Sequence, residues 1–443
     1  MTRTLIASIV ILFAADVAAA QESPAVVRLT VADAIARGME TSHRLAELRA
    51  REQGARAAVT AAGLADRPTF NAAAGYSRTN HVAEFFITQP SGLRVVVYPD
   101  IPDNFSTRVG FQWPIYTSGR TDALERAAIA EASAAGADID TARADLKLEI
   151  VRAYWAAATA RETARVIEES SARVEAQLND ARQRFNVGLI PPNEVTSLEA
   201  QRSRERAQLI EAGNLREATL IDLRRLTGLA PVTVIELSEG LADAPSPAAA
   251  AAIDEMVARA TESRPERRAL EQRAGAAEAR HQAALKATRP TVSLFGGVDY
   301  AKPNPRIFPR QPFWHRTWEL GANANWNFYD FGRAKAQAAE AAAVVTATRE
   351  RLAELDTIVS ADVRQRLLDL DSSHAIVRAT SDAVTSAAEA RRVVTDRFAA
   401  GVATSTDVLV AQVALLESEL ARTRALANVR LAEARLDRAL GRD

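Results

Sequence analysis

Few side chains in this sequence have the types and spacing that enzyme chemistry requires. The five histidines stand apart from one another, with no second histidine at a metal-ligand spacing. They are His43, His81, His281, His315 and His374. Asp369 and Asp371 lie two positions apart, so a helix would point their carboxylates to different faces, where each is solvated. The chain has no cysteine, which excludes disulfides, thiolate metal sites and a cysteine nucleophile. We therefore predict that the chain is not an enzyme and holds no metal and no cofactor.

The charge balance argues against nucleic acid as a partner. The 443 residues include 55 basic and 56 acidic side chains, a formal net charge of −1, whereas nucleic-acid-binding proteins carry a basic excess or a basic stripe. Hydrophobic residues make up 48% of the chain but aromatic residues only 5%, because alanine supplies much of the apolar share. This composition predicts long helices that pack closely.

The first twenty residues have the pattern of a secretory signal peptide. Arg3 precedes an apolar run from Leu5 to Phe13, and Ala18 and Ala20 supply the small residues of a cleavage site. We expect cleavage near Ala20, which makes 1–20 the leader. No other apolar run approaches the roughly 18–20 residues of a membrane-spanning helix, so we expect an exported protein without membrane helices.

The chain contains the same pattern twice. The segment Arg184–Gly188 recurs as Arg397–Gly401, an offset of 213 positions. Upstream, the Arg-Pro pair at 67–68 recurs at 289–290, an offset of 222. The two offsets differ by nine residues, so one connection is longer in the first copy. Regular spacing of this kind indicates a tandem duplication.

Each repeat is predicted to contain a helix, two strands, a long helix and a returning helix. The first repeat covers 21–228, with a helix over 31–65, a β-hairpin over 68–117, a long helix over 121–186 and a return helix over 194–227. Residues 229–250 form a linker or equatorial segment. The second repeat covers 251–443, with a helix over 251–288, a hairpin over 290–330, a long helix over 334–398 and a return helix over 405–440. Each long helix would measure about 100 Å, and Asn193 is the expected N-cap of the first return helix.

The segments between helices alternate apolar and polar residues at the period of a β-strand. The alternation covers 107–116 and 317–328, among others. One interpretation is a half-buried sheet packed on the helices. The other is a membrane barrel, because each strand is roughly ten residues long and aromatic residues cluster toward the strand ends. Four strands cannot close a barrel, which needs about eight, so two or three chains would share one. The expected lipid-facing aromatic residues are Phe111, Trp113, Trp318, Trp326 and Phe328.

Four segments of the chain resemble the TolC-type outer-membrane efflux protein family. They are Leu29–Ile35, Gln112–Arg120, Arg184–Leu189 and Leu226–Gly228. The resemblance implies a mainly α fold in which tandem long helical hairpins form a trimeric helical tunnel and four strands per chain contribute to a shared 12-stranded outer-membrane barrel. It implies a homotrimer that reaches from outer-membrane lipid into the periplasm and acts as a passive exit duct. The implied partners are a periplasmic adaptor protein and an inner-membrane pump of a tripartite efflux or type I secretion system.

The resemblance also assigns roles to the two turns that follow the long helices. These turns would form the closed periplasmic end and the adaptor-docking surface, through Val187, Gly188, Leu189, Gly401, Val402 and Thr404. The alternative for the glycines is a purely backbone requirement of a tight turn.

Charged residues near the same turns match the family's constriction. Asp407 matches an aspartate that forms an acidic, cation-selecting ring, and Glu194 holds the equivalent place in the first repeat. A second ring-forming aspartate is replaced here by Val410. Arg184 and Arg397 are candidates for a latch that holds the end shut. The alternative is that these charges simply complement helix dipoles.

A rival interpretation is a periplasmic helical adaptor or scaffold protein without a membrane barrel. An adaptor predicts neither strands flanked by aromatic residues nor a duplication of the whole architecture, and both patterns are present in the sequence. A soluble helical scaffold, or an enzyme, would instead use the strands as a small sheet and would be found in the soluble periplasm.

Overall fold

The computed structural model describes residues 26–241 and 252–442. The predicted signal peptide, 1–20, lies outside the described residues. The chain forms two compact units. The first, here the helical unit, comprises Met1–Thr41, Glu149–Ser246 and Ala375–Leu431. The second, the sheet unit, comprises Ser42–Leu148, Pro247–His374 and Ala432–Asp443.

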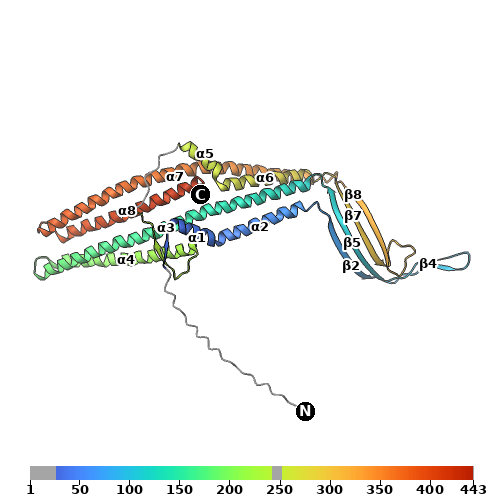
Figure 1. The fold of residues 1–443 in the computed structure, drawn as a ribbon, viewed down its shortest axis with the longest axis horizontal. Coiled ribbons are helices and arrows are strands. Elements are labelled where there is room, and N and C mark those ends of the chain that lie inside the picture. The colour runs from blue at the N-terminus through green and yellow to red at the C-terminus, as the bar shows by residue number, and fades with distance from the viewer. Residues whose placement is uncertain (1–25, 242–251, 443) are drawn as a thin grey trace, which may run out of the picture. The chain divides into compact units, whose positions relative to one another are not determined.

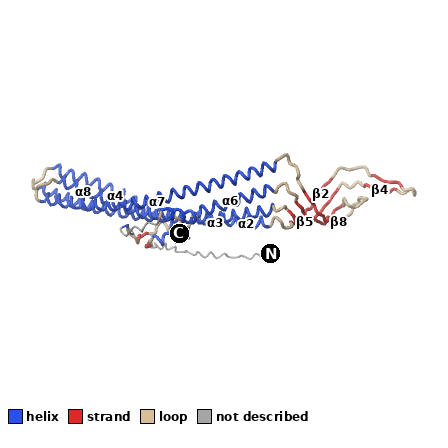
Figure 2. Tube along the Cα trace, turned by 90° about the horizontal axis from the view of Figure 1, so that it is seen from above, coloured by secondary structure: helices blue, strands red, loops and turns tan. Residues whose placement is uncertain are grey.

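Helices dominate both units, and all the strands except β1 and β6 belong to the sheet unit (Figures 1 and 2). The helices are α1 (Val31–Thr41), α2 (His43–Gly63), α3 (Arg120–Asn186), α4 (Pro192–Thr227), α5 (Ile253–Ser263), α6 (Pro265–Leu285), α7 (Arg333–Ala399) and α8 (Ser405–Ala439). The strands are β1 (Val26–Leu29), β2 (Thr69–Arg78), β3 (Phe85–Thr88), β4 (Arg94–Tyr98), β5 (Asp103–Tyr116), β6 (Val234–Leu237), β7 (Thr291–Lys302) and β8 (His315–Asn325).

The two long helices are equivalent parts of the duplication. Helices α3 and α7 each contain 67 residues, and their first residues, Arg120 and Arg333, are 213 positions apart. The return helix α4 begins earlier than predicted. Its N-cap is Pro191 and its first residue is Pro192, because a proline at this position has no N–H to leave unpaired. Asn193 therefore lies inside the first turn and is not the cap.

The single helix predicted at the start of each repeat is wrong, since each is two helices. Helix α1 gives way to α2 at Ser42, whose extended backbone lets its hydroxyl cap the N–H of Leu45. Helix α5 gives way to α6 at Arg264, which precedes Pro265 and is extended, as residues before proline prefer to be. The two breaks are 222 positions apart, so the duplication includes them.

A small parallel sheet of the helical unit was missed by the sequence analysis. Strand β1 pairs with β6, which lies in the predicted linker 229–250. The buried Tyr154 of α3 holds this sheet, because its hydroxyl donates to the Leu29 carbonyl at 3.0 Å and accepts from the Glu239 N–H at 3.1 Å. Strands of four residues carry too little periodicity to be predicted.

The main sheet lies in the sheet unit and has the order β2-β5-β7-β8, with every neighbouring pair antiparallel. These four strands run side by side (Figure 1). The first hairpin also contains a smaller antiparallel pair, β3 and β4, which the prediction of two strands per repeat did not include. This pair lies in the connection that the repeat offsets indicate is longer in the first copy.

Each unit has its own apolar core. In the helical unit, one cluster comprises Val166, Ile167, Ala212 and Leu416, and a second comprises Leu178, Ala181 and Leu198. In the sheet unit, the cluster comprises Met256, Ala260, Val359, Val363, Leu436, Ala439 and Leu440. The frequent alanines allow the helix axes to approach closely, in keeping with the composition.

Candidate functional site

The predicted site begins with the two turns that end α3 and α7, and both have the same geometry. Gly188 and Gly401 have φ values of 78° and 75°, in the left-handed region that glycine adopts without strain. The N–H of each donates to the carbonyl three residues before it, on Phe185 and Phe398. Nothing lies within 4 Å of a Cβ built on either glycine, so the backbone angle and not space requires glycine there.

The turns lie at the same end of the helical unit (Figures 1 and 2) and are in contact. The Ser405 N–H, which opens α8, donates to a Glu194 carboxylate oxygen in the first turn of α4 at 3.4 Å. Around this contact, Val187, Leu189 and Val402 are 70%, 73% and 64% exposed. The structure thus brings the predicted turn residues of both repeats into one exposed apolar tip.

Thr404 and Asp407 form a cap at the start of α8. The Thr404 N–H and hydroxyl both donate to Oδ2 of Asp407 at 2.8 Å, and the Asp407 N–H donates to the Thr404 hydroxyl at 3.1 Å. Two hydrogen bonds hold the pKa of Asp407 below its usual range: the larger effect comes from the Thr404 backbone N–H and the smaller from the Thr404 hydroxyl. The positive charge of Arg397 lowers this pKa further. The carboxylate is therefore ionised at neutral pH and exposed at the tip.

Arg184 connects the two repeats, whereas Arg397 is exposed. The Arg184 guanidinium lies 4.6 Å from the centre of the Phe398 ring, and its Nε lies 3.0 Å from Oδ2 of Asp180 on the same helix. The acidic partner is thus local and the contact between repeats is cation–π. A latch that opens and closes stays a prediction for both arginines.

A buried carboxylate below the tip was missed by the sequence analysis. Glu205 of α4 is fully buried, and its Oε1 accepts from the Ser170 hydroxyl at 3.2 Å and from the Gln201 amide at 3.0 Å. In the sequence it alternates with arginines, a pattern typical of a solvated helix face, so only the three-dimensional packing reveals its burial.

Directly paired residues point to the same side of a sheet, so the register divides the main sheet into two faces. One face is apolar and the other polar along most of the strands, whereas the strand ends farthest from the helices place charges on the apolar side, namely Arg78, Asp103, Lys302 and Arg316. The apolar face carries Phe70, Val109, Phe111, Trp113, Val298, Trp318 and Leu320. The polar face carries Thr69, Asn71, Arg108, Gln112, Asp299, Glu319 and Asn323. Phe295 also lies on the polar face, where it packs over Gly321.

Ion pairs tie the polar face together across strands. Arg108 of β5 pairs with Asp299 of β7 at 3.2 Å and also with Glu319 of β8. Arg306, in the connection between β7 and β8, pairs with the other oxygen of Glu319. The apolar face has large exposed side chains, of which Trp318 is 73% exposed. The middle of the sheet, with ion pairs on one side and exposed apolar side chains on the other, therefore needs two different surroundings.

Two of the five predicted lipid-facing aromatic residues lie outside the strands. Strand β8 ends at Asn325, so Trp326 and Phe328 follow it and the predicted alternation over 317–328 is too long. The Trp326 indole N–H donates to the Thr288 carbonyl at 3.1 Å. Trp113, its counterpart in the first repeat, donates in the same way to Asp66 at 2.9 Å. Both tryptophans thus sit where strands meet helices.

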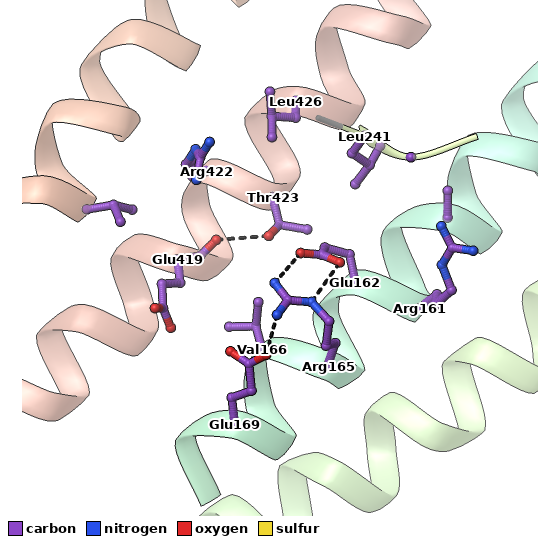
Figure 3. A pocket seen from close by; sticks show the side chains of 13 residues that line it. Arg161, Glu162, Arg165, Val166, Glu169, Leu241, Glu419, Arg422, Thr423 and Leu426 are labelled. Carbon is purple, nitrogen blue, oxygen red and sulfur yellow. Dashed lines mark hydrogen bonds and ion pairs between the residues drawn. The ribbon is translucent and has the colours of Figure 1, made fainter. Parts of the chain in front are cut away.

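A cavity of about 250 Å³ lies between α3 and α8 in the helical unit (Figure 3). Arg165 extends between the carboxylates of Glu162 and Glu169 and pairs with both. The pairing lowers the pKa of Glu162. Arg161 instead donates to the Leu237 carbonyl of β6 at 2.9 Å. Arg161, Arg165, Glu162 and Glu169 are thus already engaged by partners within the protein.

The part of the chain that the structure describes offers no cluster of three or more histidine, aspartate or glutamate side chains placed to hold a metal ion. Among those residues, no helix combines the length and the apolar character that crossing a membrane requires.

The sequence profile of one protein family matches most of the chain. The family is described as "Outer membrane efflux protein", and the match covers residues 35–229 and 256–442. Among curated proteins, Protein CyaE of Bordetella pertussis (strain Tohama I) is 29% identical over 206 residues. That alignment covers 45% of this chain and 42% of CyaE, so it spans less than half of either protein.

Solved structures of outer-membrane proteins share the fold. The outer membrane protein VceC of Vibrio cholerae matches with a TM-score of 0.75 and 20% identity, over 93% of this chain and 96% of VceC. The MtrE outer membrane channel of Neisseria gonorrhoeae, solved in its open state, matches with a TM-score of 0.75 and 20% identity, over 93% and 89%. The predicted fold class, mainly α with tandem helical hairpins and a four-stranded β part, is confirmed.

Proposed function

The chain belongs to the outer membrane efflux protein family, and from this we propose that it is the outer-membrane channel of a tripartite efflux pump or type I secretion system. Three copies form a passive exit duct, with a shared barrel in the outer membrane and a helical tunnel in the periplasm. Its partners are a periplasmic adaptor and an inner-membrane transporter.

The two-faced sheet is the observation that carries this proposal. Its apolar side chains lie in register across β2, β5, β7 and β8, and the ion-paired Arg108, Asp299 and Glu319 lie on the opposite face. The charged residues that share the apolar side are confined to the strand ends farthest from the helices: Arg78, Asp103, Lys302 and Arg316. Lipid outside and water inside are the surroundings that such a sheet requires in a barrel. The edge strands β2 and β8 have ten and eleven residues, the length that crosses a bilayer when tilted.

Sharing between chains follows from the number of strands. Four strands are too few to close a barrel, whereas three copies supply twelve when β8 of one copy pairs with β2 of the next. Trp113 and Trp326, at the junctions of strands and helices, occupy the position of an interfacial aromatic girdle.

The exposed tip fits the role of adaptor-docking end. Val187, Leu189 and Val402 offer apolar contacts there, beside the ionised carboxylate of Asp407. Repeated about a threefold axis, Asp407 gives a ring of three carboxylates that favours cations electrostatically. Val410, one turn further along α8, contributes no second ring of charge.

Membrane fractionation of a diderm host tests the main proposal. We expect the full-length protein in the outer membrane and, when solubilised in detergent without heating, at three times the mass of one chain. Recovery as a soluble periplasmic monomer contradicts the channel and favours the adaptor or scaffold interpretation.

Reversal potentials in planar bilayers test the constriction. We expect Asp407→Asn to reduce the preference for cations over anions. Glu194→Gln tests the equivalent carboxylate of the first repeat, so comparing the two variants shows which repeat supplies the charge of the constriction. Equal selectivity in Asp407→Asn and the unmodified channel places the constriction elsewhere.

A further inference from the structure

The duplication gives one contact between the repeats a second, equivalent pair of residues. The contact at the tip joins Arg184 of the first repeat to Phe398 of the second, with 4.6 Å between the guanidinium carbon and the ring centre. Phe398 is 9% exposed, so the ring is largely covered. A cation over an aromatic face is attracted by the ring quadrupole, by about 0.5–2 kcal/mol depending on solvation.

The equivalent residues are Arg397 and Phe185, each displaced by 213 positions from its counterpart. Phe185 is 41% exposed and Arg397 is also exposed. Within residues 26–241 and 252–442, the Arg397 guanidinium lies over no aromatic ring, and no guanidinium lies over the Phe185 ring. Each chain therefore has an exposed Phe185 ring on its first repeat and an exposed Arg397 guanidinium on its second.

The same asymmetry appears further along the helices. Thr423 of α8 is 5% exposed and lines the cavity beside α3. Its counterpart on α4, Ile210, is 61% exposed. On α7, the long helix of the second repeat, Ile376 is likewise exposed. At Ile210, α4 thus exposes an apolar side chain in a position that α8 covers within the chain at Thr423. At Ile376, α7 exposes another, where its counterpart on α3, Thr163, is half-buried.

We propose that a second copy of this chain covers these exposed side chains and that Arg397 of one copy lies over Phe185 of the next. The contact is head-to-tail, since different residues meet from the two copies, and repeated head-to-tail contacts close into a ring when the rotation permits. The inference rests on the proposed trimeric channel. In that trimer, Arg–Phe contacts alternate around the tip, three within chains and three between them.

Cysteine cross-linking tests the contact directly, because the natural chain has no cysteine and gives no background. The test variant carries Arg397→Cys and Phe185→Cys. The control variant carries Arg184→Cys and Phe398→Cys, the pair in contact within one chain. Both are treated in isolated outer membranes with a short bis-maleimide, which tolerates separations too long for a disulfide. Denaturing electrophoresis then measures the masses.

We expect bands at two and three chain masses, and none above three, for the test variant. The control variant should stay at one chain mass while its thiols become unreactive. The two pairs have equivalent positions, so a reagent that joins the control pair also spans the test pair if the contact forms. Each single-cysteine variant shows whether cross-links arise from two identical positions, which would contradict the assignment.

The size of the unheated, detergent-solubilised variants separates the two levels of the proposal. A trimer whose test pair does not cross-link between chains, while the control pair reacts, overturns the Arg397–Phe185 contact and leaves the channel intact. A test pair that reacts within one chain overturns the contact as well. A monomer of the unmodified protein overturns the channel and this inference together.

Discussion

Thr404 and Asp407 hydrogen-bond to each other at the first turn of α8. The N–H and the hydroxyl of Thr404 each lie 2.8 Å from the same carboxylate oxygen of Asp407. This reciprocal cap explains both residues by local structure. Asp407 nevertheless stays exposed and ionised at the tip, so the same side chain is available to a constriction.

The hydroxyl of Thr404 is expected to stabilise the start of α8. Thr404→Ala removes an N-cap and should cost about 1 kcal/mol locally, which is about a fivefold loss of protection against hydrogen exchange. Thr404→Ser keeps the hydroxyl and serves as the control. Hydrogen exchange of a peptide covering 404–410 measures the effect, and equal exchange in both variants would show that the hydroxyl does not cap.

The cap should weaken in acid. The folded-state pKa of Asp407 is lowered, so its contribution to stability is present above the pKa of the unfolded chain and is lost as pH falls through the folded value. We expect exchange protection at 404–410, corrected for intrinsic rates, to fall below about pH 4. Asp407→Asn should abolish that pH dependence. A fall of equal size in the Asn variant would assign it to another group.

The two kinds of glycine in the helical hairpin should respond to alanine with opposite signs. Gly188 has a φ of 78°, so Gly188→Ala should destabilise the turn by about 1–2 kcal/mol. Gly213 lies inside α4, and Gly213→Ala should stabilise it by up to about 1 kcal/mol. Neither site has an atom within 4 Å of the added Cβ, so sterics do not interfere. Thermal unfolding in detergent provides the comparison, and a loss of stability in both would contradict the backbone argument.

Tyr154 should hold the β1–β6 sheet through its hydroxyl. Tyr154→Phe leaves the Leu29 carbonyl and the Glu239 N–H without this partner, at a cost of about 1–3 kcal/mol. We expect faster hydrogen exchange of peptides that contain β6. Tyr329→Phe, at an exposed tyrosine, is the control. No change in exchange would mean that water replaces the hydroxyl.

Arg264 should be essential to the sheet unit. It is buried, its Nε donates to the Ala439 carbonyl at 2.7 Å, and its Nη2 pairs with Asp362 at 2.5 Å. Arg264→Ala breaks a buried pair and should cost about 3 kcal/mol. Arg259→Ala removes a solvent-exposed pair with Glu255 and should cost about 0.5 kcal/mol. Resistance of membrane-inserted protein to protease distinguishes them, and equal resistance would contradict the role of burial.

The duplication made much of the fold predictable. The offsets showed that one architecture occurs twice, so a long helix, a return helix and a hairpin predicted in one repeat were expected in the other. The family resemblance is confirmed by the match over most of the chain. The turn glycines could be predicted because a backbone with positive φ favours glycine, and glycine can be seen in the sequence. The four-residue strands β1 and β6 could not, since their pairing depends on Tyr154, which lies 80 residues before the first residue of β6.

Breaks and ends of elements were harder to predict than the elements themselves. A composition rich in alanine and arginine continues across Ser42 and Arg264, and only a cap and a following proline mark the breaks. At the tip, the sequence predicted which residues would gather but not that Arg184 would find Phe398 as its partner. Such pairings depend on how the repeats pack, which no local pattern encodes.

The order β2-β5-β7-β8 leaves two strands of the main sheet with one side unpaired. A single chain cannot satisfy those backbone groups in lipid, where each unpaired group costs several kcal/mol. The sheet is therefore completed by association between chains, and the rate of this association must depend on the concentration of chains. Before association, each chain has two unpaired edge strands, which can pair with strands of other proteins and cause aggregation. Assembly of the proposed trimer therefore depends on the local concentration of chains as well as on the fold of each one.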